Sequence, residues 1–190
     1  MQKLKLIVSD LDGTLLDSKH NLPSDFWEIE QKMVDENIIF AVASGRQYYN
    51  IIQIFEKIKH RTLFLAENGT YAFYKGKELF VNPIANNEAI KFVKIGRKIN
   101  DAYVILCGKK SAYVENNDER FLKEVQTYYS KLEIVSDLTS VDDDILKVTL
   151  CDFNTVSTNS YLHFKEYENQ FLTGKQNNVP NAIQDKPNAI

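Results

Sequence analysis

The sequence predicts an α/β fold with a parallel sheet in its N-terminal part, and three observations support this prediction. Short apolar runs at residues 4–9, 38–43 and 62–66 have the length of buried strands. Amphipathic segments separate these runs, so the order is strand, helix, strand, helix, strand. This order implies right-handed crossovers and parallel strands, and each predicted strand ends in a polar segment. Ligands bind beyond the carboxyl ends of such strands, so these segments indicate a site.

The first half of the chain carries recognisable boundary signals. Asp25 and Glu28 have the spacing of a capping pair, which predicts that a helix begins there. Asn37 is a plausible end for that helix. The second helix is marked by apolar residues from Tyr48 to Ile58. The polar segments that close the three strands are residues 10–14, 44–46 and 67–69.

After residue 69 the pattern changes from alternating strands and helices to hairpins. We expect hairpins at 71–81 and 103–115, helices at 87–98, 118–129 and 155–168, and a strand at 145–150. This mixture predicts a separate α+β layer inserted after the third strand, with a boundary near Pro83. The expected domains are a core in 1–82, an α+β cap in 83–172 and an irregular tail in 173–190, where apolar periodicity fades and where the chain can begin its return to the core.

Composition excludes several classes of protein. The chain has 190 residues, of which 44% are hydrophobic and 26% charged, as in folded soluble proteins. The net charge of −3 and the absence of a long Lys/Arg run argue against nucleic-acid binding. Cys107 and Cys151 lie in apolar runs without CxxC spacing, which predicts buried thiols. The chain shows no signal peptide and no membrane-spanning stretch, so we expect a cytoplasmic protein that does not contact the membrane.

The segment Asp10-Leu11-Asp12-Gly13-Thr14 carries the strongest chemical signal. Two carboxylates one residue apart can share a hard divalent cation, because such cations prefer oxygen ligands. A carboxylate at the open end of a buried strand can also act as a nucleophile. Gly13 lets the chain turn without a side-chain clash. An acidic pair in this position therefore indicates a catalytic or metal site rather than a solvated loop.

These residues carry a family resemblance. VSDLDGTLLDS at 8–18 resembles the first motif of haloacid dehalogenase-type phosphatases, and in particular of the Cof-like sugar-phosphate phosphatases, also called subclass IIB. ASGR at 43–46 resembles their second motif, and ENG at 67–69 matches a segment after their third strand. The resemblance implies a Rossmann-like core with an inserted cap. It also implies a Mg²⁺-dependent phosphatase that acts on small phosphorylated metabolites such as sugar phosphates.

The resemblance also assigns roles to individual residues. Asp10 would attack phosphorus and become an aspartyl-phosphate, and Asp12 would act as general acid and then base. The Asp10 carboxylate and the Asp12 backbone carbonyl would hold Mg²⁺. The residues expected to bind phosphate or substrate, or to brace the loop, are Thr14, Ser44, Gly45, Arg46, Asn68 and Lys186.

Simpler interpretations of several of these residues stay open at this point. Ser44 can also cap the following helix, and Arg46 can be a solvated residue of its first turn. Residues 67–69 can form only a tight turn. A receiver-like signalling domain is disfavoured, because such domains carry their phosphoacceptor at the third strand, where this chain has Glu67-Asn68-Gly69, and because they lack an inserted domain of this size. The three histidines have no ligand spacing, so the sequence assigns them no role.

The chain departs from the family pattern near its end. The late acidic motif GDxxND is absent, and Lys186 only resembles the motif lysine, since Pro187 stands where the family prefers Gly. We therefore expect a core that is incomplete at its C-terminus, with an open sheet edge through which the protein can form a homodimer. The alternative function is a catalytically weak or inactive protein that binds phosphate or a metabolite.

Overall fold

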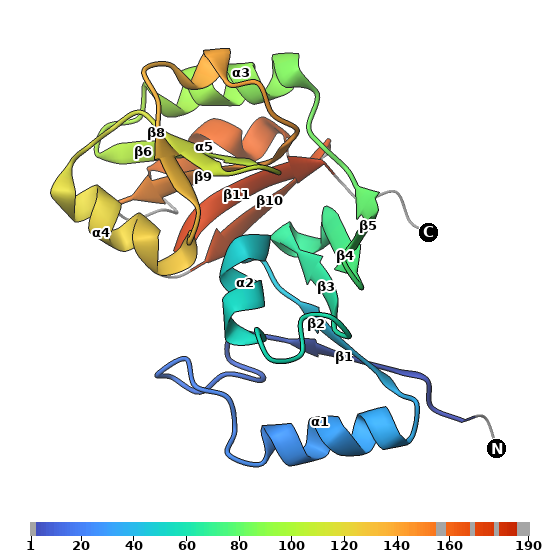
Figure 1. The fold of residues 1–190 in the computed structure, drawn as a ribbon. Coiled ribbons are helices and arrows are strands. Elements are labelled where there is room, and N and C mark those ends of the chain that lie inside the picture. Colours follow the sequence, from blue (N-terminus) through green and yellow to red (C-terminus); the bar gives the residue numbers. More distant parts are fainter. Residues whose placement is uncertain (1–2, 155–158, 168–169, 177–178, 186–190) are drawn as a thin grey trace. The chain divides into compact units, whose positions relative to one another are not determined.

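The computed structural model describes residues 3–154, 159–167, 170–176 and 179–185 (Figure 1). The chain divides into two compact units, Met1–Val81 and Asn82–Ile190. The division falls close to Pro83, where the sequence changes from alternating strands and helices to hairpins.

The first unit is built on a five-stranded sheet with the order β1-β2-β3-β4-β5. The first three strands are parallel, and β4 and β5 extend the sheet as an antiparallel hairpin. The expected order of strands and helices is confirmed, although the second helix ends earlier than predicted. The elements are β1 (Leu6–Asp10), α1 (Phe26–Asp35), β2 (Ile39–Ala43), α2 (Tyr48–Ile54), β3 (Leu63–Ala66), the 3₁₀ turn η1 (Glu67–Gly69), β4 (Tyr71–Tyr74) and β5 (Lys77–Val81).

Both helices of the first unit pack on one face of the sheet. The ring of Phe26 on α1 lies 5.4 Å from that of Phe40 on β2 and 5.8 Å from that of Phe55 at the end of α2. Phe64 on β3 completes the cluster, 6.4 Å from Phe55. Burying each phenylalanine is worth roughly 1.5–3 kcal/mol. This aromatic core fixes the helices to the strands and so holds the strand ends in place.

The opposite face of this sheet is apolar and open along β1. Leu6 and Val8 on β1 are 42% and 50% exposed, and Ile39 on β2 is 37% exposed. Parallel sheets normally carry helices on both faces, and the described residues supply helices for one face. β1 is also the outermost strand of the described sheet. Among the described residues no strand pairs with the outer edge of β1, and dimerisation through that edge stays a prediction.

The predicted capping pair at the start of α1 does not form. Asp25 is the N-cap residue of α1, but its side chain makes no capping hydrogen bond. Its backbone angles, φ −91° and ψ −2°, lie near the helical region. An N-cap side chain reaches the first turn from extended backbone angles, so Asp25 is wrongly placed to form a capping pair with Glu28.

The second unit is a six-stranded sheet with the order β10-β11-β9-β6-β7-β8. α3 packs on one face through Phe92 and Val93, and α4 packs on the other through Phe121 and Val125. The described elements are α3 (Asn86–Gly96), β6 (Ala102–Gly108), β7 (Ala112–Val114), α4 (Glu119–Tyr128), β8 (Leu132–Ile134), the 3₁₀ turn η2 (Leu138–Ser140), β9 (Ile145–Asp152), α5 (Ser160–Phe164), the 3₁₀ turn η3 (Lys165–Tyr167), β10 (Phe171–Gln176) and β11 (Val179–Asp185). In these described parts, no helix is long and apolar enough to cross a membrane.

The cysteine prediction is confirmed in this unit. Cys107 on β6 and Cys151 on β9 are both buried, and neither is in a disulfide with the other. Burial raises the pKa of the Cys151 thiol to about 12, because the thiolate would lose its hydration. Both thiols therefore act as packing residues of the sheet.

The tail prediction is wrong for the residues that the structure describes. Instead of an irregular segment, β10 and β11 form an antiparallel hairpin, and β11 pairs with β9 through Ala182 and Thr149. Backbone pairing to a neighbouring strand orders this segment despite its weak hydrophobic pattern. Strand β8 was not predicted either, because it is short and its residues alternate weakly. Lys186, the candidate motif lysine, lies outside the described residues.

Candidate functional site

The parallel register brings the ends of three strands together. Asp10, the last residue of β1, is paired with Ala43, the last residue of β2. Ala43 is in turn paired with Leu65 on β3. The segments that follow these strands, 10–14, 44–46 and 67–69, must therefore leave the sheet at the same edge.

Backbone hydrogen bonds then connect two of these segments directly. The Ser44 amide donates to the Leu65 carbonyl (2.9 Å), and the Asn68 amide donates to the Ser44 carbonyl (3.0 Å). The Glu67 amide donates to the Arg46 carbonyl (3.1 Å). Because the connections run through the main chain, they fix the spacing between the second and third segments independently of their side chains.

The first segment forms a tight turn around an exposed carboxylate. Leu11 is fully buried, and its carbonyl accepts from the Leu16 amide (2.9 Å), which closes the turn. Gly13 has φ +77°, a left-handed angle that residues with a Cβ rarely adopt. The Thr14 hydroxyl donates to Oδ2 of Asp10 (3.0 Å). The Asp10 carboxylate is thus oriented on one side and exposed to solvent on the other.

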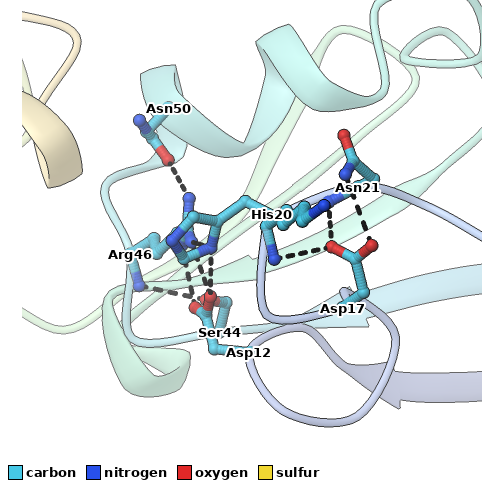
Figure 2. Close-up of polar contacts among 8 residues, drawn as sticks. Asp12, Asp17, His20, Asn21, Ser44, Arg46 and Asn50 are labelled. Atoms are coloured by element: carbon cyan, nitrogen blue, oxygen red, sulfur yellow. Dashed lines mark hydrogen bonds and ion pairs between the residues drawn. The ribbon is translucent and has the colours of Figure 1, made fainter.

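Arg46 binds the second carboxylate of the motif (Figure 2). Its Nε donates to Oδ2 of Asp12 (2.8 Å), and a terminal nitrogen donates to Oδ1 (2.5 Å). The other terminal nitrogen donates to Oδ1 of Asn50 on α2 (3.0 Å). Arg46 is therefore not a solvated first-turn residue, since its side chain is only 8% exposed. It forms a bidentate ion pair that joins the first and second segments.

Ser44 does not cap the helix that follows it. α2 begins at Tyr48, and its N-cap residue is Gln47, whose side chain makes no capping hydrogen bond. The Ser44 hydroxyl oxygen instead accepts from the Arg46 amide (3.1 Å) and is buried at the strand end. Its hydroxyl hydrogen can still donate, so the predicted bond to a phosphoryl oxygen stays open.

Gly45 and Asn68 lie in contact. A Cβ added to Gly45 would collide with the side-chain oxygen of Asn68, so a larger residue there would displace the asparagine side chain. Asn68 itself has φ +56°, which asparagine tolerates better than most residues. The 67–69 segment is therefore a tight turn and also a neighbour of the second segment. The tight-turn interpretation is thus confirmed, and the contact of Asn68 with substrate stays a prediction.

The structure adds a contact that the sequence did not indicate. His20, to which the sequence assigned no role, lies beside the Asp12–Arg46 pair, with Nδ1 2.9 Å from the arginine and 3.7 Å from Oδ1 of Asp12 (Figure 2). Histidine spacing carried no signal, because the contact depends on how the loop after residue 16 folds back. Asn50 was missed for a different reason: it looked like any polar residue on the surface of a helix.

The oxygen donors at this edge suit a weakly held magnesium ion. The exposed Asp10 carboxylate and the Asp12 carbonyl are hard ligands, and Mg²⁺ commonly keeps several waters when one or two carboxylates bind it. The Asp12 carboxylate is engaged by Arg46, so only its carbonyl fits the predicted role. Within the described ranges, no group of three His, Cys, Asp or Glu side chains surrounds a metal position.

Comparisons with known proteins agree with this geometry. The family model of haloacid dehalogenase-like hydrolases matches residues 7–186. The 5-amino-6-(5-phospho-D-ribitylamino)uracil phosphatase YbjI of Escherichia coli is 34% identical over 149 residues, which are 77% of this chain and 55% of YbjI. The chain thus spans little more than half the length of this curated relative.

Solved structures share the fold at lower identity. SMU.1108c of Streptococcus mutans superposes with a TM-score of 0.84 at 22% identity, covering 97% of this chain and 71% of that one. The HAD subclass IIB sugar phosphatase BT4131 gives a TM-score of 0.73 at 18% identity, covering 96% and 70%. Since the family model matches nearly the whole sequence and the motif residues meet at one sheet edge, the chain belongs to the haloacid dehalogenase-like hydrolases.

Proposed function

We propose that the protein hydrolyses phosphate monoesters of small metabolites, such as sugar phosphates, with Mg²⁺ as cofactor. The observation that carries this proposal is the exposed Asp10 carboxylate at the end of β1, held by Thr14 beside the Asp12–Arg46 pair. The relative YbjI, by its name, removes phosphate from a phosphorylated ribityl compound. A substrate of this size and charge suits a site made of hydroxyl, amide and guanidinium donors.

The proposed reaction has two displacement steps. In the first, an oxygen of Asp10 attacks phosphorus, the bond to the leaving oxygen breaks, and Asp12 gives that oxygen its proton. In the second, Asp12 takes a proton from water, and this water attacks phosphorus, which frees Asp10 and releases inorganic phosphate. Ser44 would donate its hydroxyl hydrogen to a phosphoryl oxygen in both steps.

The ion pair sets a condition on the first step. Both oxygens of Asp12 accept hydrogen bonds from Arg46, whereas a general acid must present a proton to the leaving oxygen. We propose that, when substrate binds, the guanidinium turns one of its two donors from Asp12 to a phosphoryl oxygen and keeps the other on Asp12. One Asp12 oxygen then becomes free to hold the proton that the leaving group needs.

The same proposal assigns a ligand set and a role for the second unit. The Asp10 carboxylate and the Asp12 carbonyl would hold the magnesium ion, whose positive charge would offset the repulsion between Asp10 and the phosphoryl group. We propose that Met1–Val81 is the catalytic core and that Asn82–Ile190 is a cap whose shape selects the substrate.

Hydrolysis of p-nitrophenyl phosphate with Mg²⁺ tests the proposal. Asp10→Asn is expected to lower kcat by at least about 1000-fold, because the amide is a poor nucleophile. Asp25→Asn is the matched control, since Asp25 is exposed and its side chain makes no capping bond. Chelation of Mg²⁺ should abolish the wild-type rate, and added Mg²⁺ should restore it. Equal background rates in wild type and Asp10→Asn would reject the enzyme and support a phosphate-binding module.

A further inference from the structure

The loop that follows the first motif is more ordered than a connection requires. The Asp17 carboxylate accepts from the amides of Lys19 and Asn21, both at 2.8 Å, and the Asp17 amide donates to the Asn21 carbonyl (3.0 Å). The His20 amide donates to the Asp17 carbonyl (2.9 Å). These bonds also lower the pKa of Asp17, chiefly through the Asn21 amide. The loop is closed on itself at both ends of the 17–21 segment (Figure 2).

The hydrogen bonds within the 17–21 loop place the His20 side chain next to Arg46. His20 has φ +60°, and its ring nitrogen Nδ1 lies 2.9 Å from a terminal nitrogen of Arg46. A guanidinium has donors only and keeps its charge at all ordinary pH values, so Nδ1 must be the acceptor. His20 and Asp12 share the same terminal nitrogen of Arg46.

We propose that His20 is a positioning residue that holds the guanidinium of Arg46 against Asp12. The proposal rests on the proposed function, in which Asp12 is the acid and base. Arg46 would then be fixed from three sides, by Asp12, by Asn50 and by His20. Asp12 and Asn50 set the plane of the guanidinium, and His20 limits its movement away from the first motif. His20 is about half exposed, so we expect a moderate effect on catalysis.

Two substitutions of His20 distinguish the effect of its contact with Arg46 from the effect of the loop's backbone conformation. Glycine and asparagine both accept a left-handed φ, so neither His20→Gly nor His20→Asn should strain the loop. Only asparagine keeps an acceptor, since its Oδ1 is attached to Cγ as Nδ1 is in histidine. We expect His20→Gly to lower kcat for p-nitrophenyl phosphate by about 10-fold with little change in KM, because misplacing Asp12 affects the reaction step more than binding. We expect His20→Asn to stay within about 3-fold of wild type.

A spectroscopic measurement tests the contact without relying on catalysis. The ring nitrogens of His20 can be observed by ¹⁵N NMR at about pH 8, above the range in which histidine ordinarily titrates, and assigned by their loss in His20→Gly. In Arg46→Met the Nδ1 resonance of His20 should shift, since its donor is gone, while those of His60 and His163 should not. An unmoved Nδ1 resonance would overturn the proposal.

The kinetic outcomes are equally decisive. Wild-type kcat in His20→Gly would refute a positioning role, and so would an equal loss in the glycine and asparagine variants, because the acceptor would then be irrelevant. If wild-type protein hydrolyses no phosphate ester, the proposed function fails, and the nitrogen spectrum still decides whether His20 holds Arg46.

Discussion

Burial rather than bond length should decide which ion pair stabilises the first unit. Two pairs involve helix α1, and each has an N–O distance of 2.7 Å: Arg61 with Glu30, and Lys32 with Glu28. The Glu30 side chain is 4% exposed, whereas both members of the Lys32 pair are about 70% exposed, at 69% and 71%. Replacing either cation by methionine removes the charge and keeps an unbranched side chain. Arg61→Met and Lys32→Met are therefore a matched comparison.

The expected losses differ several-fold. Arg61 donates two hydrogen bonds to Glu30, at 2.9 and 2.7 Å, and without it a carboxylate stays buried unpaired. Breaking a buried pair typically costs 3–5 kcal/mol, but Arg61 is 34% exposed and water can partly replace it, so we expect about 2–3 kcal/mol. Lys32→Met should cost about 0.3–0.5 kcal/mol, as for exposed pairs within a helix.

Urea unfolding followed by tryptophan fluorescence measures both losses. Trp27 is the only tryptophan in the sequence and lies on α1, so the signal reports the unit that carries both pairs. The free energy of unfolding follows from linear extrapolation. Similar small losses in the two variants would refute the argument, because burial would then not control the strength of the pair. The double variant Glu30→Met/Arg61→Met should recover most of the loss, since it leaves no buried charge.

Two further predictions concern a helix cap and a loop. Asp118→Ala should destabilise the second unit by about 1 kcal/mol, because the Asp118 carboxylate accepts from the Phe121 amide (2.9 Å), whereas Asp25→Ala, which removes no capping bond, should cost less than about 0.5 kcal/mol. Urea unfolding followed by circular dichroism measures both changes, and equal losses would contradict the capping assignment. The lowered pKa of Asp17 means that its ionised form stabilises the fold above the unfolded-state pKa of about 4, and that this contribution is lost as the pH falls from there through the folded value. Unfolding between pH 5 and 2 should therefore show a weaker acid dependence in Asp17→Asn, and an unchanged slope would contradict the prediction.

The sequence was sufficient for elements with strong periodicity. The three buried strands and the helices between them were predicted because apolar runs and helical spacing alternate clearly. It failed where backbone pairing rather than hydrophobic pattern orders the chain. β10 and β11 contain Asn181 and Pro180 and were expected to be irregular, yet β11 pairs with β9. Such pairing depends on a partner distant in the sequence, which local patterns do not reveal.

In the candidate site too, some features could be predicted from the sequence and others could not. That Asp10, Ser44 and Asn68 share one sheet edge followed from strand order alone, since parallel strands end on the same side. The partner of Arg46 could not be predicted from the sequence, because Asp10, Asp12 and the solvent were all possible partners for its guanidinium. The structure shows that Arg46 pairs with Asp12, beside the strand ends that the Asp10–Ala43 register brings together.

This dependence on register has a consequence for how the motif works. A shift of one residue between β1 and β2 would turn the Asp10 side chain to the other face of the sheet and move Arg46 away from Asp12. The turn at Gly13 and the closed loop at Asp17 then have a common effect, since each fixes a segment whose position the strand pairing alone leaves free. The catalytic geometry proposed for this chain therefore rests on the backbone of the first unit as much as on the identity of its acidic residues. Substitutions that loosen the loop should reduce catalysis even where they leave Asp10, Asp12 and Arg46 unchanged.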